Sequence, residues 1–339
     1  PAKLERFRAI VKPWYLIYYF RARSFLKKLL SQEKFDVIHH ITPFAFRYPS
    51  PAAGLGVPLI RGPIAGGLQT PEGLKAYVKG GNRLLNLMRR SDGVRKKFDP
   101  ILRNSYRNTQ TTLVAAPYVH DIVSPLALNR SIVEIELGIA ENIEEIVKYH
   151  DDQSNVIRLL YVGRVIHTKG LRETIISLKK TNEKNNIVLN VIGDGDALGE
   201  CIAVAGDIPE HCTVNFLGWK SKLEIEQYYR QSDVFVFPSF REPTGGVLLE
   251  AMSYSLPCIT CKYGGPEYLV TPECGILVEP NDLEKFTGEI ASAINTLCED
   301  AKMRAQMSHH SWARANTFFD WATKRERLQE IYNETSTKR

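Results

Sequence analysis

The chain of 339 residues has no run of 18 or more consecutive apolar residues, whereas a membrane-spanning helix needs about 20. Charged residues near its start, among them Lys3, Arg6, Arg8 and Lys12, also leave no apolar segment of the kind that a signal peptide requires. We therefore expect a cytoplasmic protein with neither a transmembrane helix nor a signal peptide.

Cysteine is scarce and scattered. The six cysteines are too far apart to suggest a disulfide framework. Cys258 and Cys261 have the C-x-x-C spacing of a zinc or redox motif, but a zinc knuckle would need a second pair, and the sequence has none. We expect these residues to form a buried strand after Pro257, and we expect no metal and no cofactor.

Charge is divided unevenly along the chain, although the overall composition of 44% apolar and 24% charged residues is ordinary for a soluble globular protein. Residues 1–130 carry 22 basic and 7 acidic side chains, a net +15, whereas residues 131–339 carry 22 and 31, a net −9. The first part should therefore face an anionic partner. An anionic membrane surface fits this pattern. Nucleic acid does not, because base-reading and stacking motifs are missing.

The second part of the sequence alternates short apolar strands with amphipathic helices, a pattern typical of a doubly wound α/β sheet. We predict strands at 157–162, 187–192, 213–217, 233–237, 257–261 and 275–278, and helices at 170–180, 197–204, 221–231, 246–254, 282–298 and 320–333.

The first part is less regular. We predict a helix over 14–31 and strands at 36–40, 57–61, 111–116 and 132–136, followed by a polar linker over about 139–155. The domains predicted are 1–140, incomplete at its start, and 141–319, with a C-terminal helix over 320–339 that packs back toward the first domain.

Two glutamates flank a glycine pair between a predicted strand and a predicted helix. Glu242 and Glu250 are separated by seven residues, with Gly245 and Gly246 between them. The end of a strand in an open α/β sheet is where ligands bind, and a helix N-terminus attracts phosphate or sugar oxygens. Taken alone, the two glutamates would be ordinary surface charge; their setting favours a site that grips hydroxyl groups.

The segment Phe237–Met252 resembles the donor site of retaining glycosyltransferases of family four, which have the two-domain GT-B fold. The resemblance implies that Glu250 binds the ribose hydroxyls and Glu242 the transferred sugar. Main-chain groups of Gly245, Gly246, Val247 and Leu248 would hold the sugar and phosphate. Pro243 and Thr244 depart from the family pattern, which puts the shape of the sugar pocket in question.

A second match to the family runs from Leu159 to Gly170. Gly163 and Arg164 follow a predicted strand, and Lys169 comes five residues after Arg164. Arginine binds phosphate bidentately and lysine supplies a mobile charge, so this pair suits a diphosphate. The alternative is two solvated surface charges. The family uses this pair on the donor diphosphate.

Two further turns resemble the family's nucleotide-binding segments. Gly193 begins G-x-G-x-x-x-G, which is one residue too long for a dinucleotide fingerprint. Asp194 and Asp196 imitate a metal motif, but Arg164 and Lys169 can neutralise a diphosphate without a metal. Lys220 ends the segment that, by resemblance, holds the base.

The acceptor side has a weaker pattern. His39 and His40 end a predicted strand where the family often has His-x-His, so which of them is functional stays open. A lone histidine on a strand is more often structural. Gly62, Gly66 and Gly67 lie in a loop that resembles an acceptor-side loop of some family members.

Basic and aromatic residues mix at 14–23, and a second basic segment lies at 89–97; basic groups beside aromatic ones suit a membrane interface. The same aromatic residues could equally be core, exposed because a preceding unit is missing: family members begin with a strand and a glycine-rich loop that are not evident here. The second part thus predicts a donor domain, whereas the first leaves these two readings open.

The chain is therefore identified as a retaining, metal-independent glycosyltransferase of GT-B architecture, peripheral on the cytoplasmic face of a membrane. The resemblance implies a UDP- or GDP-linked sugar donor and a glycan or lipid-linked acceptor, in the synthesis of surface polysaccharides or glycoconjugates. The alternative is a non-catalytic relative that binds a nucleotide sugar or a partner protein.

Overall fold

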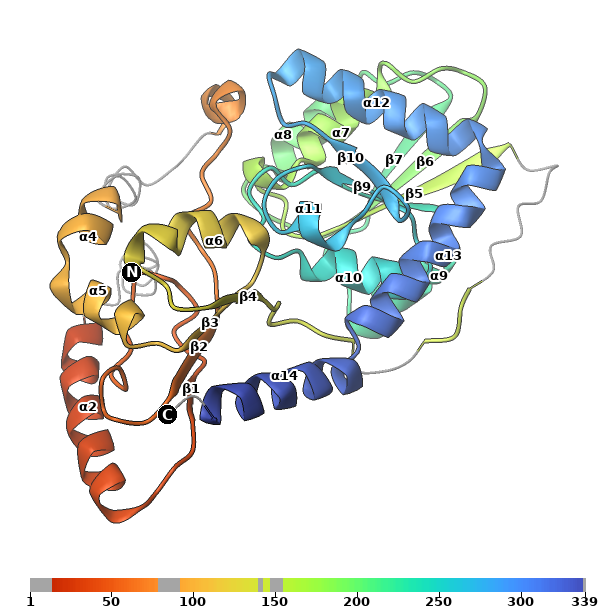
Figure 1. Cartoon of the computed structure of the whole chain (residues 1–339). Helices are drawn as coiled ribbons and strands as arrows, with labels where there is room; N and C mark the ends of the chain where they lie inside the picture. Colours follow the sequence, from red (N-terminus) through yellow and green to blue (C-terminus); the bar gives the residue numbers. More distant parts are fainter. Residues whose placement is uncertain (1–13, 79–91, 140–142, 147–154, 338–339) are drawn as a thin grey trace. The chain divides into compact units, whose positions relative to one another are not determined.

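The computed structural model describes residues 14–78, 92–139, 143–146 and 155–337. The chain divides into two compact units, each with its own parallel sheet (Figure 1). Unit 1 comprises Pro1–Gly67, Asn82–Glu136 and Arg327–Arg339, and unit 2 comprises Leu68–Gly81 and Leu137–Glu326. The two-domain α/β architecture is therefore confirmed. The basic residues before Trp14, together with Arg89 and Arg90, lie outside the described residues.

Unit 1 is a four-stranded parallel sheet in the order β1-β2-β3-β4. Its strands lie where the sequence predicts strands, whereas its short helices α4, α5 and α6 were not predicted. The helix N-termini have local causes: Asp99 caps α5 by accepting from the Leu102 amide at 3.0 Å, and proline occupies the first position of α5 and of α6. The elements are α2 (Tyr15–Gln32), β1 (Ile38–His40), β2 (Leu59–Ile64), α4 (Asp92–Phe98), α5 (Pro100–Arg107), β3 (Thr111–Val114), α6 (Pro117–Val123) and β4 (Ser131–Val133).

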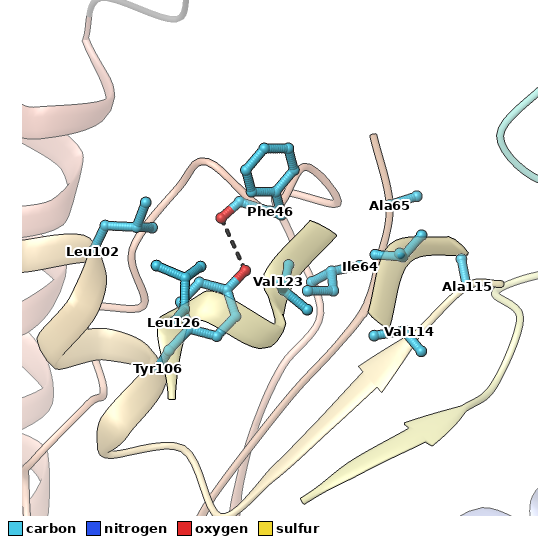
Figure 2. Packing of buried hydrophobic residues seen from close by; sticks show 10 residues of the cluster. Phe46, Ile64, Ala65, Leu102, Tyr106, Val114, Ala115, Val123 and Leu126 are labelled. Carbon is cyan, nitrogen blue, oxygen red and sulfur yellow. Dashed lines mark hydrogen bonds between the residues drawn. The ribbon is translucent and has the colours of Figure 1, made fainter. Parts of the chain in front are cut away.

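One face of this sheet carries the main apolar core of unit 1 (Figure 2). Tyr106 is fully buried, and its hydroxyl donates a hydrogen bond to the Phe46 carbonyl at 2.9 Å. Ile64 and Val114 come from the strands, and Leu102 and Leu126 from the helical side. Burying such side chains supplies most of the favourable free energy of folding.

The last helix, α14 (Trp321–Ser336), begins in unit 2 and ends in unit 1. Its final turns cover the sheet of unit 1: Ile331 packs against Ile60 and Leu113. The hydroxyl groups of Thr111 and Thr335 are 3.1 Å apart. Residues far apart in sequence thus complete this sheet's second face.

Unit 2 is a six-stranded parallel sheet in the order β10-β9-β8-β5-β6-β7, and Figure 1 shows helices on both of its faces. Its strands are β5 (Val156–Val162), β6 (Asn186–Ile192), β7 (Cys212–Phe216), β8 (Val234–Phe237), β9 (Cys258–Cys261) and β10 (Gly275–Val278). Its helices are α7 (Leu171–Leu178), α8 (Leu198–Ala205), α9 (Lys222–Gln231), α10 (Gly246–Ser253), α11 (Pro266–Leu269), α12 (Leu283–Glu299) and α13 (Ala301–Phe318).

The predicted strands of unit 2 match the observed ones to within one residue at each end. The central strands β8 and β9 are short apolar runs buried on both faces, whereas the edge strand β7 alternates with exposed residues. Cys258 and Cys261 lie in the buried strand β9, as predicted, and all six cysteines are buried and free. Helix α13 was not predicted. It packs on α10, and the Ser308 hydroxyl donates to the Ser255 carbonyl at 2.5 Å.

Two further segments pack onto unit 2. One precedes the predicted second domain, and the other is part of the predicted linker. The Tyr263 hydroxyl donates to the Gln69 carbonyl at 3.0 Å, which ties the segment around Gln69 to this unit. Within the stretch expected to be a free linker, the Ile143 carbonyl accepts from the Trp312 indole at 2.6 Å and the Ile146 amide donates to Ser255 at 3.0 Å. Residues 143–146 are therefore bound to the unit 2 surface.

Candidate functional site

Glycine turns follow β5 and β6 at the carboxyl edge of the unit 2 sheet. The Gly163 amide donates to the Ile192 carbonyl at 3.0 Å, and the Gly193 amide to the Gly218 carbonyl at 2.9 Å. A Cβ atom on Gly193, whose φ is +140°, would lie 1.9 Å from the Gly163 carbonyl oxygen. Only glycine permits this approach. At Gly163 and Gly193 no side chain therefore stands between the backbone and a ligand.

Lys169 and Glu242 meet at this edge. Lys169 ends a short 3₁₀ turn (His167–Lys169) before α7, and Glu242 follows β8. The Lys169 Nζ donates to a Glu242 carboxylate oxygen, and both side chains are nearly buried. The lysine Nζ also lies 5.4 Å from the centre of the Phe237 ring. A cation and an anion predicted to bind different parts of one ligand are thus direct neighbours.

Arg164 is exposed on the same turn as Gly163. Its backbone carbonyl accepts a hydrogen bond from the Tyr161 hydroxyl at 3.2 Å. Among the described residues, its guanidinium forms no ion pair. The backbone of Arg164 is therefore fixed while its charge stays free for an anion.

Helix α10 begins at the predicted glycine pair. Gly245 is its N-cap, in the left-handed region with φ of +98°. The Gly245 carbonyl accepts from the Leu248 amide at 2.9 Å, while the first amides of a helix, here those of Gly246 and Val247, have no partner within it. The Glu242 carbonyl accepts from the Gly265 amide at 3.0 Å. The helix N-terminus and Glu242 are thus held at one end of β8, where anionic or hydroxyl groups are favoured.

Glu250 lies one turn into α10, with its carboxylate 3.3 Å from the Tyr229 hydroxyl, which donates to it. Burial of the carboxyl raises its pKa, while the Tyr229 hydrogen bond and the Lys222 charge oppose the rise. Glu250 has no cationic partner at hydrogen-bonding distance among the described residues, so its second oxygen remains an acceptor for donors such as hydroxyl groups.

Lys220 and Asp194 have local partners. The Lys220 Nζ is 3.3 Å from Glu224, and Glu224 completes a capping box with Ser221 at the start of α9. Asp194 accepts from the Gly195 amide at 2.7 Å. Within the described ranges, three or more histidine, cysteine or acidic side chains nowhere gather as a metal site would need.

The two histidines of β1 differ in their surroundings. The His39 Nδ1 lies 2.8 Å from the Tyr332 hydroxyl and its Nε2 lies 2.7 Å from the Gly62 carbonyl oxygen. A carbonyl can only accept, so Nε2 carries the proton and Nδ1 accepts from Tyr332. Burial lowers the pKa of His39, which agrees with a neutral ring. Both its nitrogens are thus engaged.

His40 has neither ring nitrogen in a hydrogen bond with the described residues. Burial, and next the Arg61 charge, lower its pKa to about 4. The Thr42 backbone opposes this shift without reaching hydrogen-bonding geometry. His40 is therefore neutral near pH 7, and of the two histidines it is the one with unused donor and acceptor capacity.

The predicted acceptor-side glycines lie in and after β2 of unit 1. Gly62 is within β2, and Gly66 and Gly67 follow it, packing near Phe46 and Ile122. Sequence reasoning overlooked Arg61, which is buried beside His40, and Tyr332, which orients His39. The sequence does offer a signal for Arg61, which is a basic residue within an apolar strand. It offers no signal for Tyr332, because Tyr332 lies 293 positions away from His39 in the sequence.

No helix in the described ranges is both long and apolar enough to cross a membrane.

Comparison with known proteins adds independent information. The family described as glycosyl transferases group 1 matches residues 142–311. The capsular polysaccharide biosynthesis glycosyltransferase CapM of Staphylococcus aureus is 30% identical over 194 residues, which cover 55% of this chain and 48% of that protein. The lipopolysaccharide core biosynthesis glycosyltransferase LpsE of Rhizobium meliloti is 25% identical over 244 residues, 71% of this chain and 69% of that protein. The chain spans about half the length of most curated relatives that it matches.

Solved structures support the fold. Anabaena Alr3699/HepE in complex with UDP and glucose has a TM-score of 0.61 and 18% identity, over 93% of this chain and 81% of that one. The lipopolysaccharide outer core galactosyltransferase WaaB has a TM-score of 0.59 and 16% identity, over 94% and 81%. These similarities agree with two Rossmann-like domains in a GT-B arrangement.

Proposed function

The chain belongs to the glycosyl transferases group 1, and from this membership we propose that it is a retaining glycosyltransferase. It transfers a sugar from a UDP- or GDP-linked donor to a glycan or lipid-linked acceptor in surface polysaccharide or glycoconjugate synthesis. The observation that carries the proposal is the meeting of Lys169, Glu242 and the α10 N-terminus at one edge of the unit 2 sheet.

The donor diphosphate is bound by Arg164 and Lys169. Arg164 is exposed at the sheet edge and has no ion-pair partner among the described residues, and the ammonium group of Lys169 can exchange Glu242 for a phosphate oxygen. Two cations and the free amides at the α10 N-terminus can together offset the two negative charges of a diphosphate. This charge balance supports a metal-independent reaction.

The sugar and the ribose are bound by different glutamates. Glu242 is next to Lys169 and to Gly245, so it is placed to hold the transferred sugar beside the diphosphate. Glu250 lies further along α10 and keeps a free carboxylate oxygen, which suits the ribose hydroxyls. Gly193 and the Lys220 segment, at the ends of the neighbouring strands, hold the nucleotide.

Retention follows from attack on the same face of the sugar that the diphosphate leaves. Arg164 and Lys169 stabilise the negative charge that develops on the leaving phosphate. None of the candidate residues is assigned as a covalent nucleophile, because Glu242 is proposed to bind the hydroxyls of the transferred sugar. On the acceptor side, His40 rather than His39 supplies a hydrogen bond, because both nitrogens of His39 are already used.

The acceptor side faces an anionic membrane surface through α2. The helix has no acidic residue in its 18 positions, and its basic residues Arg21, Lys27 and Lys28 are exposed. Its large apolar residues Trp14, Leu16, Ile17, Tyr18, Phe20 and Phe25 are all about half exposed or more. Aromatic rings interleaved with basic groups suit the lipid headgroup region. This arrangement supports a protein that is peripheral on the cytoplasmic face of a membrane.

The test is a thermal-shift panel of UDP- and GDP-linked sugars, followed by a turnover assay on the donor that binds. A donor bound at a hundredfold excess over its Kd stabilises the fold by about 2.7 kcal/mol. Binding with hydrolysis or transfer of the sugar supports the enzyme. Binding without any turnover would instead support a non-catalytic relative that holds a nucleotide sugar. If no nucleotide sugar raises the melting temperature, both the enzyme and the non-catalytic relative are contradicted.

A further inference from the structure

Arg61 is an unusual residue in unit 1 because it is buried without an acidic partner. It lies on β2, is 1% exposed, and forms no ion pair with any carboxylate in the described part of the chain. One of its terminal nitrogens donates to the Phe46 carbonyl at 3.2 Å and also to the Tyr48 carbonyl. The other terminal nitrogen and Nε have no hydrogen-bond partner within the described ranges. Buried arginines are almost always paired, because an uncompensated buried charge is costly.

His40 lies beside Arg61 and also has buried polar atoms that are not hydrogen-bonded within the described residues. The two residues are register partners on the adjacent strands β1 and β2, so their side chains project from the same face of the sheet. Both ring nitrogens of His40 are buried and lack a hydrogen-bond partner in the part of the chain that the structure describes. Four polar atoms of two neighbouring side chains are therefore unsatisfied at one place. Such a cluster in a native fold calls for an unseen ion, ligand or water.

The hydroxyl of Thr112, the register partner of Arg61 on β3, is also buried without a hydrogen-bond partner among the described residues, whereas the two tyrosine hydroxyls near the guanidinium are bonded. Tyr106 lies under the guanidinium, with the Arg61 Cζ 4.2 Å from the ring centre, and its hydroxyl is bonded to Phe46, as Figure 2 shows. The Tyr15 hydroxyl donates to the Pro49 carbonyl at 2.7 Å. These contacts fix the guanidinium in place but do not neutralise its charge. An anion would neutralise it.

A cavity of about 670 Å³ reaches His40 from the α2 side. Its apolar wall includes Tyr18, Phe25, Leu26 and Ile38, and Arg21 adds a second positive charge. Cavities of roughly 300–1,000 Å³ are typical of small-molecule sites. Arg61 does not line the cavity, but His40, its register partner, does. A molecule with its hydrocarbon part in the cavity would therefore bring an anionic group to Arg61 past His40.

We infer that Arg61 and His40 bind a phosphate group carried by an apolar molecule, whose hydrocarbon part occupies the cavity under α2. Phosphate fits better than carboxylate, because its several oxygens can accept from Arg61 Nε, from the free terminal nitrogen and from a ring N–H of His40 together. That this phosphate ester is the sugar acceptor rests on the proposed function, whereas its binding does not.

The experiment uses the full chain without a donor and three probes: inorganic phosphate, octyl phosphate below its critical micelle concentration, and octyl glucoside as an uncharged match. Histidine ring resonances are followed by NMR, with His40 assigned through His40→Asn. Octyl phosphate should bind tighter than both other probes and shift the His40 resonances, while those of the exposed His309 and His310 stay unchanged. Equal affinity for inorganic phosphate would overturn the apolar part of the inference, and octyl glucoside binding as tightly would overturn the phosphate part.

Variants test the two side chains. Arg61→Gln should weaken octyl phosphate binding about tenfold to a hundredfold, since it removes charge-assisted hydrogen bonds. Arg23→Gln is the matched control, because Arg23 also donates to two carbonyls, those of Pro51 and Ala53; it should leave binding unchanged. If Arg61→Gln fails to fold, His40→Asn, which keeps the Arg61 contacts, should still lower the affinity. Unchanged affinity in His40→Asn and any folded Arg61 variant would refute the site.

Two further comparisons distinguish this site from the membrane surface and from the donor site. Loss of octyl phosphate binding with anionic vesicle binding intact would assign the site to single molecules and not to the bilayer surface. A nucleotide-sugar response in the thermal-shift panel, together with no response to octyl phosphate, would sink this inference and leave the proposed function standing, because the donor residues all lie in unit 2.

Discussion

Lys169 is bonded to Glu242, the residue proposed to bind the transferred sugar. Both side chains are only 12–13% exposed, so each charge is largely removed from water and neutralised by the other. On the proposed assignment, a donor would separate this pair, giving a phosphate to Lys169 and sugar hydroxyls to Glu242. The pair would thereby couple binding of the phosphate to binding of the sugar.

Removing either cation of the proposed diphosphate site should weaken binding of the nucleotide diphosphate itself. Arg164→Ala and Lys169→Ala should each cost roughly 1.5–3 kcal/mol, the value of a hydrogen bond to a charged group. Isothermal titration calorimetry measures this directly. Lys179→Ala, which loses only an exposed ion pair with Asp207, is the control. Wild-type affinity in both site variants would remove the diphosphate assignment.

The two glutamates should differ when no sugar is attached. Glu250→Gln should weaken binding of the free nucleotide diphosphate, because it reduces the acceptor strength offered to the ribose. Glu242→Gln should leave that affinity nearly intact, or raise it slightly because Lys169 is released, while turnover falls. Calorimetry and initial rates with the donor identified by thermal shift separate these effects. Identical behaviour of the two variants toward the free nucleotide would contradict the division of roles.

Stability should depend on pH through Glu173, which lies in the first turn of α7. The side chain is 2% exposed, and one of its oxygens lacks a hydrogen-bond partner. Burial raises its pKa from 4.5 to about 7. The folded state therefore binds this proton more tightly than the unfolded state, so the contribution is complete below pH 4.5 and is lost as the pH rises through about 7.

The loss should amount to about 3 kcal/mol of the free energy of unfolding. Glu173→Gln should remove this part of the pH dependence and be more stable than wild type at pH 8. Urea denaturation at pH 5, 6.5 and 8 measures it. Glu284→Gln, at an exposed ion pair with Lys180, should keep the wild-type slope. A Glu173→Gln curve parallel to wild type would show that Glu173 does not titrate in this range.

Helix α2 should bind anionic and not neutral liposomes, and the binding should weaken with salt, because the Debye length falls from about 10 Å at 0.1 M to about 3 Å at 1 M. Replacing Arg21, Lys27 and Lys28 by glutamate should abolish it, since each basic group near the surface is worth about 1 kcal/mol. Arg95 and Lys96 are a weaker choice: Arg95 pairs with Asp99, and Lys96 donates to the Ile122 carbonyl.

Flotation with neutral and anionic vesicles is the measurement, and Arg95→Glu with Lys96→Glu is the comparison variant. Equal partitioning of the wild type into both vesicles, or into neither, would mean that the basic side of unit 1 serves an acidic glycan or protein partner instead.

The sequence by itself determined unit 2. Strands such as Val156–Val162 and Val234–Phe237 are apolar runs followed by glycine or proline. The proposed donor residues follow the same strand ends: Arg164 and Lys169 lie within 7 positions of Val162, and Glu242 and Glu250 within 13 positions of Phe237. Each is placed by a local strand-to-helix turn, so a short stretch of sequence contains the information. Helix α13 was missed because its apolar residues do not follow a clear helical period. The helix is stabilised by packing on α10.

Only the tertiary structure decided how the separate motifs meet. The Lys169–Glu242 pair joins residues 73 positions apart, and the turns at Gly163 and Gly193 touch because β5 and β6 are neighbours in the sheet. In unit 1, adjacent histidines received opposite environments, because successive side chains of a strand face opposite sides. His39 faces Tyr332 of the last helix, and His40 faces the buried Arg61. The sequence shows which groups are present, but a hydrogen bond or an unpaired charge depends on the neighbour that folding brings.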